Sequence, residues 1–203
     1  MKITAIILAS GFSKRFQGNK LLTLYKEKPL IMHTVDKVIK QDFYEVIIVS
    51  QYDEILSLVS SARSSKGIIK AIKNNNPQRG ISESIKSGVK VSKPCDAYMF
   101  FVGDAPLIRE ETIEDMMGMY KALEAKETAI LCPFYEGERG NPVIFAHVYQ
   151  KELMELSGDE GGKQLIARHH ECVIRYEVGH RKELFDIDTQ LDFNELLQST
   201  KID

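Results

Sequence analysis

The sequence predicts an α/β protein with one mostly parallel, mixed sheet flanked by helices in three layers. Segments rich in β-branched residues alternate with segments whose apolar residues recur every three or four positions, which is typical of strands followed by helices. The strand-like runs are continuously apolar, as expected where helices cover both faces of a sheet. Two later runs lie close enough together to pair as a hairpin, which adds antiparallel pairing. We expect residues 1–203 to form a single domain, because this length suits one sizeable core.

The chain up to residue 102 predicts four strands joined by three helices. Runs of β-branched and other apolar residues predict strands over residues 3–8, 46–49, 68–72 and 97–102. Pro29 opens the first helical pattern, because proline is favoured in the first turn of a helix. The apolar residues whose spacing predicts the three helices are, in order, Ile31, Val35, Val38 and Ile39; then Ile55, Leu58 and Val59; then Ile81, Ile85 and Val89.

The rest of the chain predicts another helix, a hairpin and a terminal helix. Apolar residues at helical spacing over residues 113–123 predict the helix, and we assign its methionines to the core rather than to a cofactor site. The turn at residues 136–140 separates two strands, as in a hairpin. The remaining elements are expected as strands over residues 129–132 and 142–145, a helix over 150–156, strands over 172–178 and 184–187, and a terminal helix with Leu191, Leu196 and Leu197.

Composition excludes several classes of partner. The 27 Lys and Arg residues nearly balance the 29 Asp and Glu residues, and the net charge of −2 argues against a nucleic acid held by bulk positive charge. No apolar run is long enough to span a bilayer, and the apolar N-terminal residues fit a buried strand better than a signal peptide. Cys95, Cys132 and Cys172 form no CxxC pair, so we expect buried, reduced thiols in a cytoplasmic protein.

The loop after the first predicted strand is suited to binding phosphate. Ligands of open α/β sheets bind outside the carboxyl ends of the strands, so the loops at those ends form the candidate site. Residues 9–20 combine glycines with the cations Lys14, Arg15 and Lys20, and glycines let backbone N–H groups approach phosphate oxygens. The loop matches neither GxxxxGK[ST] nor GxGxxG, which disfavours an ATPase P-loop and a dinucleotide-binding oxidoreductase. A solvated basic loop without a ligand is the alternative.

The same loop carries a resemblance to a known family. The segment LASGFSKR at residues 8–15, followed by Lys20, resembles the triphosphate loop L-A-x-G-x-S-x-R-M-G-x-x-K of the MobA-like nucleotidyltransferases, with Phe16 and Gln17 in place of the usual Met and Gly. This resemblance implies a Rossmann-like nucleotidyltransferase fold, and it makes Arg15 and Lys20 catalytic residues that stabilise pyrophosphate. The nucleotide-binding residues that it implies in this loop are Leu8, Ala9, Ser10, Gly11, Ser13, Arg15 and Lys20.

The second candidate loop, residues 75–84, leads into a predicted helix. The free N–H groups and the dipole at a helix N-terminus favour an anion or a polar base edge. Ser84 and Gly88 lie off the apolar face of this helix and are expected to face a ligand, whereas Ser82 acting only as a helix cap is the alternative. The family pattern N-P-x-x-x-G-x-x-x-S implies that base and sugar contact Asn76, Pro77, Gly80 and Ser84.

Asp104 follows the strand predicted over residues 97–102. A carboxylate at this place either caps the next turn or holds a cation, and Mg²⁺ prefers one or two carboxylates together with substrate phosphates. The segment Gly103-Asp104-Ala105-Pro106 matches the family's G-D-x-P motif. The resemblance therefore implies that Asp104 is a catalytic, nucleotide-binding residue that anchors Mg²⁺.

The last candidate loop contains Asp186 and Asp188, which share a face if the segment is extended. A cation between these like charges is one reading; in the other, Thr189 or Asp188 caps the terminal helix, with Asp192 in its first turn, and both readings are compatible. The segment resembles D-I-D-T-P-x-D of the MocA-type cytidylyltransferases, with Gln190 at the proline position. Because the MobA guanylyltransferases tend to have N-x-N-T here, the resemblance favours cytidylyl transfer and implies metal ligands among Asp104, Asp186 and Asp188.

Two further segments are expected to bind the second substrate. Residues 139–143 resemble the family's G-x-x-G-H-P-V, with Asn141 in place of His, and residues 158–163 resemble G-D-x-G-A-R. Ordinary turns are the alternative at both places. The acceptor-binding residues implied by the resemblance are Gly140, Asn141, Pro142, Gly158, Asp159, Gly161, Gly162 and Lys163.

The resemblance as a whole implies a Mg²⁺-dependent nucleotidyltransferase. It would transfer CMP from CTP to the terminal phosphate of molybdopterin or Mo-molybdopterin and release pyrophosphate, and a molybdoenzyme that receives the product would be a partner. A MobA-like guanylyltransferase, or a transferase that acts on a sugar phosphate or another phosphate acceptor, is the alternative within enzymes. A non-catalytic nucleotide-sensing protein on the same fold is the alternative from another class.

Overall fold

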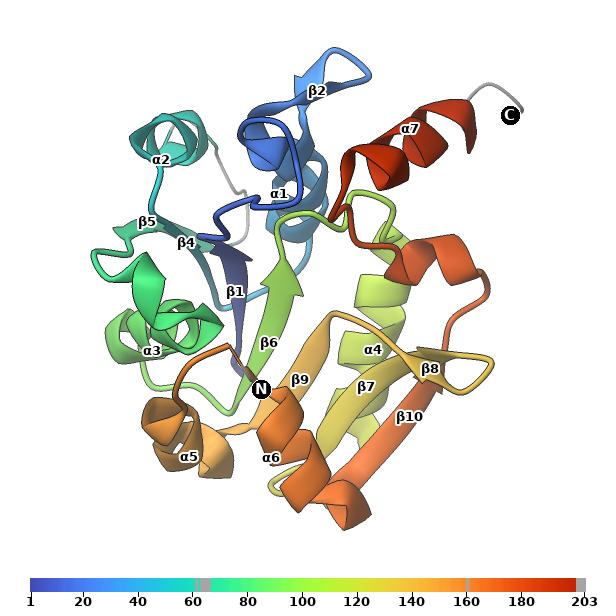
Figure 1. Cartoon of the computed structure of the whole chain (residues 1–203). Helices are drawn as coiled ribbons and strands as arrows, with labels where there is room; N and C mark the ends of the chain where they lie inside the picture. Colours follow the sequence, from blue (N-terminus) through green and yellow to red (C-terminus); the bar gives the residue numbers. More distant parts are fainter. Residues whose placement is uncertain (61, 63–66, 160, 200–203) are drawn as a thin grey trace.

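A mixed sheet between two layers of helices forms the centre of the molecule (Figure 1). The computed structural model describes residues 1–60, 62, 67–159 and 161–199. The strands of the sheet follow the spatial order β10-β7-β9-β6-β1-β4-β5, and β8 pairs with β7. Their bounds are Ile3–Ala9 (β1), Glu45–Ser50 (β4), Ile68–Lys73 (β5), Ala97–Val102 (β6), Ile130–Tyr135 (β7), Glu138–Arg139 (β8), Val143–Ala146 (β9) and Val173–Glu177 (β10).

The helices lie on both faces of this sheet, which confirms the predicted three-layer α/β fold (Figure 1). On one face, α1, α2 and α4 share a core with the sheet, and on the other face α3, α5 and α6 do so. The helices are Leu30–Lys40 (α1), Asp53–Ser60 (α2), Ile81–Val91 (α3), Glu110–Ala122 (α4), Gln150–Glu155 (α5), Lys163–Arg168 (α6) and Gln190–Ser199 (α7). A small separate hairpin pairs Leu24–Tyr25 (β2) with Lys28–Pro29 (β3).

Strand direction makes the sheet mixed, as expected from the hairpin signal. Strands β5, β4, β1 and β6 run parallel to one another, and β10 runs parallel to β7. Strand β9 is antiparallel to both β6 and β7, between which it lies. Because the parallel strands end at one edge, the loops that follow β1 and β6 meet there.

Strand β1 shows why its sequence is apolar at successive positions. Ile3 and Ile7 pack into the core shared with α1, α2 and α4, whereas Ile6 packs into the core shared with α3 and α5. All three side chains are buried, and each contributes about 1.5–3 kcal/mol through burial. Successive side chains of a strand point to opposite faces of the sheet, so a strand covered on both faces needs apolar residues at successive positions. The continuous apolar run of β1 supplies them.

The strand expected over residues 184–187 is wrong. The 3₁₀ turn η5 spans Arg181–Leu184, and the described residues that follow it up to α7 form no strand. Ile187 instead packs against Leu30 and Phe193, and its N–H donates to the carbonyl of Asp104 at 3.0 Å. The apolar alternation of this segment therefore serves a small core beneath α7 rather than a sheet face.

Two local expectations also need correction. Gly88 does not face a ligand: it packs against β1, where a Cβ atom would lie 2.6 Å from Cγ2 of Ile6. Cys172 is partly exposed, whereas Cys95 and Cys132 are buried, and all three thiols are free. Helix α6 was not expected, since its six residues carry too short a periodic pattern.

The described helices show no candidate membrane span, since none of them combines sufficient length with sufficient hydropathy to cross a bilayer.

Candidate active site

All four predicted candidate loops contribute residues to a cavity of about 340 Å³ at the carboxyl end of β1. We call it the β1 pocket. It brings together all the predicted nucleotide-binding residues except Ala9, which is buried in the core, and Asn76. Its lining comprises Leu8, Ser10, Gly11, Phe12, Ser13, Lys14, Arg15, Lys20, Pro77, Gly80, Ile81, Ser84, Val102, Asp104, Asp159 and Asp188.

The loop after β1 folds back on itself, which places Lys20 inside this pocket. Ser13 adopts a positive φ of 52°, and its hydroxyl accepts a hydrogen bond from the N–H of Lys20 at 3.4 Å. The side chain of Asn19 then caps the 3₁₀ turn η1, Lys20–Leu22, by accepting from the N–H of Leu21 at 3.1 Å. Because Lys20 is the first residue of this turn, the cap holds the backbone of Lys20 in position.

Lys20 lies between two of the predicted metal-binding carboxylates. Its ammonium is 2.5 Å from Oδ2 of Asp104 and 3.1 Å from Oδ1 of Asp188, and only 9% of the lysine side chain is exposed. Burial alone would lower the pKa of Lys20, but Asp104 and Asp188 outweigh burial and raise the pKa above its ordinary value. Arg15 pairs with the other oxygen of Asp188 at 2.7 Å, in a more exposed place. The pocket thus holds balanced charges of both signs.

The start of α7 holds Asp188 in position through a capping box. Oδ2 of Asp192 accepts from the N–H groups of Asp188 at 2.9 Å and Thr189 at 2.7 Å. In return, the N–H of Asp192 donates to the hydroxyl of Thr189 at 3.2 Å. This confirms the capping role expected of Thr189 and Asp192, and it leaves the carboxylate of Asp188 available to the pocket.

Asp186 lies apart from the β1 pocket and lines a neighbouring cavity. Burial, then the nearby charges of Asp104 and Asp188, raises the pKa of Asp186 to about 7. Among the described residues, its Oδ1 atom is buried without a hydrogen-bond partner. The described residues contain no group of three or more His, Cys, Asp or Glu side chains arranged to hold a metal ion. The pair formed by Asp104 and Asp188 already accommodates the charge of an ammonium, and this pair suits a cation.

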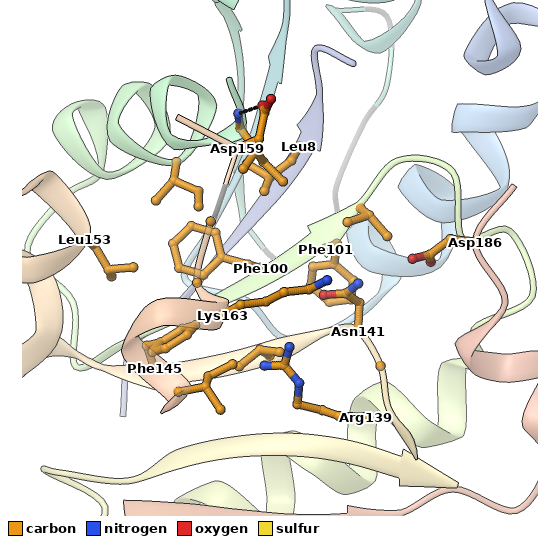
Figure 2. Close-up of a pocket in the computed structure, with 18 of the residues that line it drawn as sticks. Leu8, Phe100, Phe101, Arg139, Asn141, Phe145, Leu153, Asp159, Lys163 and Asp186 are labelled. Carbon is orange, nitrogen blue, oxygen red and sulfur yellow. Dashed lines mark hydrogen bonds between the residues drawn. The ribbon is translucent and has the colours of Figure 1, made fainter. Parts of the chain in front are cut away.

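The neighbouring cavity, of about 330 Å³, we call the β9 pocket (Figure 2). It contains all the predicted acceptor-binding residues except Pro142 and Gly158. Lys163 from α6 and Asn141 from the loop before β9 extend into it from different sides, and Arg139 lies on the same side of the cavity as Phe145 (Figure 2). The lining comprises Leu8, Ile81, Ile85, Phe100, Phe101, Val102, Arg139, Gly140, Asn141, Val143, Phe145, Leu153, Asp159, Gly161, Gly162, Lys163, Ile166, Leu184 and Asp186.

Sequence reasoning missed several members of the β9 pocket. Arg139 lies within the segment 139–143 that resembles a family motif but was not among the predicted acceptor-binding residues, and its charge in a glycine-bearing turn was a usable signal. The aromatic walls Phe100, Phe101 and Phe145 lie on β6 and β9, where each also serves as a buried strand residue. An aromatic residue in a buried strand carries no mark that distinguishes a pocket wall from the core.

Asp159 borders both pockets and ties the loop before α6 to α3. Its carboxylate accepts from the N–H of Ile81 at 3.2 Å, and the carbonyl of Gly158 accepts from the N–H of Ser82 at 3.2 Å (Figure 2). Gly80 at φ 86° precedes the helix, and a Cβ atom there would lie 2.4 Å from the carbonyl oxygen of Gly158. The alternative reading of Ser82 as the cap of α3 is wrong, because Gly80 occupies the cap position. The hydroxyl of Ser82 instead donates to the carbonyl of Arg79.

Residues 5–173 match the family model of the MobA-like NTP transferase domain. The chain belongs to this family. The match covers most of β1, the loop that carries Lys20, Asp104, and the residues of the β9 pocket up to the end of α6. It confirms the resemblance found in the sequence. MobA-like NTP transferases are nucleotidyltransferases, so membership in this family supports the prediction that the protein is an enzyme.

Curated relatives of this MobA-like NTP transferase are distant in sequence. It is 24% identical over 201 residues to the probable molybdenum cofactor guanylyltransferase of Thermococcus sibiricus, covering 94% of this chain and 95% of that protein. It is 24% identical to the bifunctional protein GlmU of Clostridium acetobutylicum over 98% of this chain, but it spans only 41% of that protein. It is 28% identical to the 3-deoxy-manno-octulosonate cytidylyltransferase of Anaeromyxobacter dehalogenans, covering 84% of this chain and 72% of that protein.

Solved structures share the fold of this MobA-like NTP transferase. A nucleotidyl transferase from Methanothermobacter thermautotrophicus superposes with a TM-score of 0.83 at 17% identity, over 100% of this chain and 99% of that one. A manganese complex of the protein Rv0371c from Mycobacterium tuberculosis superposes with a TM-score of 0.77 at 20% identity, over 98% of this chain and 100% of that one. These likenesses confirm the Rossmann-like nucleotidyltransferase fold.

Proposed function

We propose that this MobA-like NTP transferase is a cytoplasmic, Mg²⁺-dependent cytidylyltransferase of molybdenum cofactor biosynthesis. In this proposal CTP binds in the β1 pocket, and molybdopterin or Mo-molybdopterin binds in the β9 pocket. The observation that carries it is the cluster of Lys20, Asp104 and Asp188, which lines the β1 pocket. The β1 and β9 pockets adjoin each other, because Leu8, Ile81, Val102 and Asp159 line both. A molybdoenzyme that receives the product is the expected partner.

The reaction would be a displacement at the α-phosphorus of the nucleotide. An oxygen of the acceptor's terminal phosphate forms the new P–O bond, the bond to the β-phosphate oxygen breaks, and pyrophosphate leaves with the electron pair of that bond. Positioning and charge neutralisation contribute most to such reactions. Arg15 and Lys20 would bind the leaving pyrophosphate, because both cations line the β1 pocket. Predicted contacts with base and sugar remain those of Pro77, Gly80 and Ser84.

Asp104 and Asp188 are the residues that fit a divalent metal. Their oxygens approach the same ammonium, so the fold already tolerates a cation between them, and oxygen ligands of this kind suit Mg²⁺. A bound Mg²⁺ would neutralise phosphate charge. The manganese complex of Rv0371c has the same fold, which supports a divalent metal in proteins of this architecture. Asp186 would lie on the acceptor side, and we do not assign it to the metal.

The acceptor pocket combines aromatic walls with two cations, Arg139 and Lys163. Flat aromatic surfaces suit a planar ring system, and cations suit a phosphate. Both features agree with a pterin that carries a terminal phosphate. Asn141, in place of the histidine usual in the family motif, would contact the acceptor from the loop before β9.

Guanylyl transfer is the second candidate, because the Thermococcus sibiricus relative is named a guanylyltransferase. Thermal-shift binding with CTP, GTP, ATP and UTP in the presence of Mg²⁺ separates the two, since a ligand that binds the folded state raises its Tm. We expect selective stabilisation by CTP, followed by pyrophosphate release when Mo-molybdopterin is added. Selective stabilisation by GTP would replace the cytidylyl assignment with the guanylyl one. Nucleotide binding without release of pyrophosphate from the nucleotide, whichever acceptor is added, would favour a nucleotide sensor.

A further inference from the structure

Three consecutive side chains, beginning with the last residue of β4, bind three consecutive carbonyls, beginning with the last residue of β1. The hydrogen bonds run from Ser50 Oγ to Ala9 O (2.9 Å), from Gln51 Nε2 to Ser10 O (2.7 Å), and from Tyr52 OH to Gly11 O (2.8 Å). Gln51 and Tyr52 lie outside the segments that resemble the family's motifs, and neither lines the β1 pocket.

The register of the sheet explains this series. Strands β1 and β4 pair in parallel up to the position where Ala9 lies opposite Ser50. Beyond that position the two segments no longer form a backbone ladder, but they continue side by side, with Gln51 beside Ser10 and Tyr52 beside Gly11. Side-chain donors therefore take over from backbone donors, one residue at a time, along the start of the loop.

These bonds fix the orientation of two peptide units. In a planar trans peptide, the carbonyl of one residue and the N–H of the next point in opposite directions. Because the carbonyls of Ser10 and Gly11 point toward Gln51 and Tyr52, the N–H groups of Gly11 and Phe12 point away from them. Gly11 and Phe12 both line the β1 pocket, and in the described part of the chain neither N–H donates to an acceptor.

We propose that Gln51 and Tyr52 are positioning residues for the triphosphate. By binding the carbonyls of Ser10 and Gly11, they hold the N–H groups of Gly11 and Phe12 toward the phosphate oxygens of the bound nucleotide. Unpaired N–H groups that converge on a concave site are a recurring means of anion binding, and donors held in place in advance lose less entropy on binding. This inference rests on the proposed binding of a nucleoside triphosphate in the β1 pocket.

The test measures the affinity for inorganic pyrophosphate and for CTP by titration calorimetry, in wild type and in Gln51→Leu and Tyr52→Phe. Each variant removes one donor while keeping most of the side-chain volume. We expect each to weaken both affinities by the same factor, about 3- to 10-fold, as the loss of one hydrogen bond predicts. In steady-state measurements, the KM for the nucleotide should rise while the KM for the acceptor stays constant. Unchanged affinities for pyrophosphate would overturn the proposal.

Tyr120→Phe is the matched control. Its hydroxyl also donates to a backbone carbonyl, that of Lys126 at 2.7 Å, but it lies on α4 and does not line the β1 pocket. The control should keep the wild-type affinity for pyrophosphate. An equal loss of affinity in Tyr120→Phe would mean that general destabilisation causes the effect, which would also overturn the proposal.

A second readout observes the two N–H groups directly. In wild type, addition of pyrophosphate should shift the amide resonances of Gly11 and Phe12, and the shifts should shrink in Tyr52→Phe. Pyrophosphate has no base, so the test is valid whichever nucleotide the protein uses. If wild type binds neither pyrophosphate nor any nucleoside triphosphate, the proposed function fails and this inference fails with it. If wild type binds both and the variants bind equally well, only this inference fails.

Discussion

The ammonium of Lys20 and the carboxylate of Asp104 form a close ion pair, 2.5 Å apart, in a place where little of either side chain is exposed. Each ion neutralises the other in a partly dry environment, where charge interactions are stronger than in water. Asp188 shares the same ammonium, so the three groups act as one unit. A change at any of them alters the charge that the others experience.

Replacement of Asp104 by Asn should abolish most of the activity while the fold remains. The substitution removes the carboxylate that would hold the metal, and we expect Mg²⁺-dependent pyrophosphate release to fall about 100-fold or more. Lys20 keeps Asp188 as a partner, so circular dichroism should show a folded protein. Asp53→Asn, which removes the partner of Lys73 at an exposed place, is the control and should keep full activity. Turnover near wild type in Asp104→Asn would contradict the metal assignment.

Lys20→Met should separate nucleotide binding from metal binding. Loss of the cation should weaken nucleoside triphosphate affinity about 10-fold. Without the ammonium, Asp104 and Asp188 repel each other, so Mn²⁺ should bind more tightly to the nucleotide-free variant than to wild type. Electron paramagnetic resonance of free Mn²⁺ measures this directly. A variant with both affinities unchanged would exclude Lys20 from the site.

The stability of the protein should depend on pH through Asp186. Its pKa is about 7 in the folded state against an ordinary value of 3.8, so the folded state keeps a proton that the unfolded chain releases. The contribution of Asp186 to the free energy of unfolding is therefore largest below pH 3.8, and it is lost as the pH rises through about 7. Asp186→Asn cannot ionise, so at alkaline pH it should be more stable than wild type by up to about 4 kcal/mol. Urea unfolding at acidic and alkaline pH checks this; parallel pH profiles for the two proteins would refute it.

Asp192→Ala should loosen the start of α7. The variant loses the acceptor of two N–H groups, and we expect the free energy of unfolding to fall by about 1 kcal/mol. Asp192→Asn keeps an acceptor oxygen and should restore most of the stability. Equal losses in both variants, measured by thermal or urea unfolding, would show that charge rather than capping holds this helix start.

Sequence alone predicts most of the fold, because continuous apolar runs and helical spacing carry strong signals, as in β1 and α1. It fails at residues 184–187, where an apolar alternation packs beneath α7 instead of joining a sheet. It also places Lys20 and Asp104 in one site through the carboxyl-edge rule. The sequence predicts neither the raised pKa of Asp186 nor the series of hydrogen bonds from Ser50 to Tyr52, because both depend on strand register and burial that arise only in the folded chain. The single-domain assignment over residues 1–203 stays a prediction.

The reversed direction of β9 has a consequence for how new specificities arise. Val143, at the start of β9, lies opposite Phe100, near the end of β6, so the segment that enters β9 reaches the same edge as the segment that leaves β6. One half of the sheet therefore supplies the loops around Lys20, and the other half supplies the turn that carries Arg139 and Asn141. Under the proposed function, substitutions in that turn would exchange the recipient of the nucleotide while the half of the sheet that binds the nucleotide stays intact. The architecture is modular within one continuous sheet.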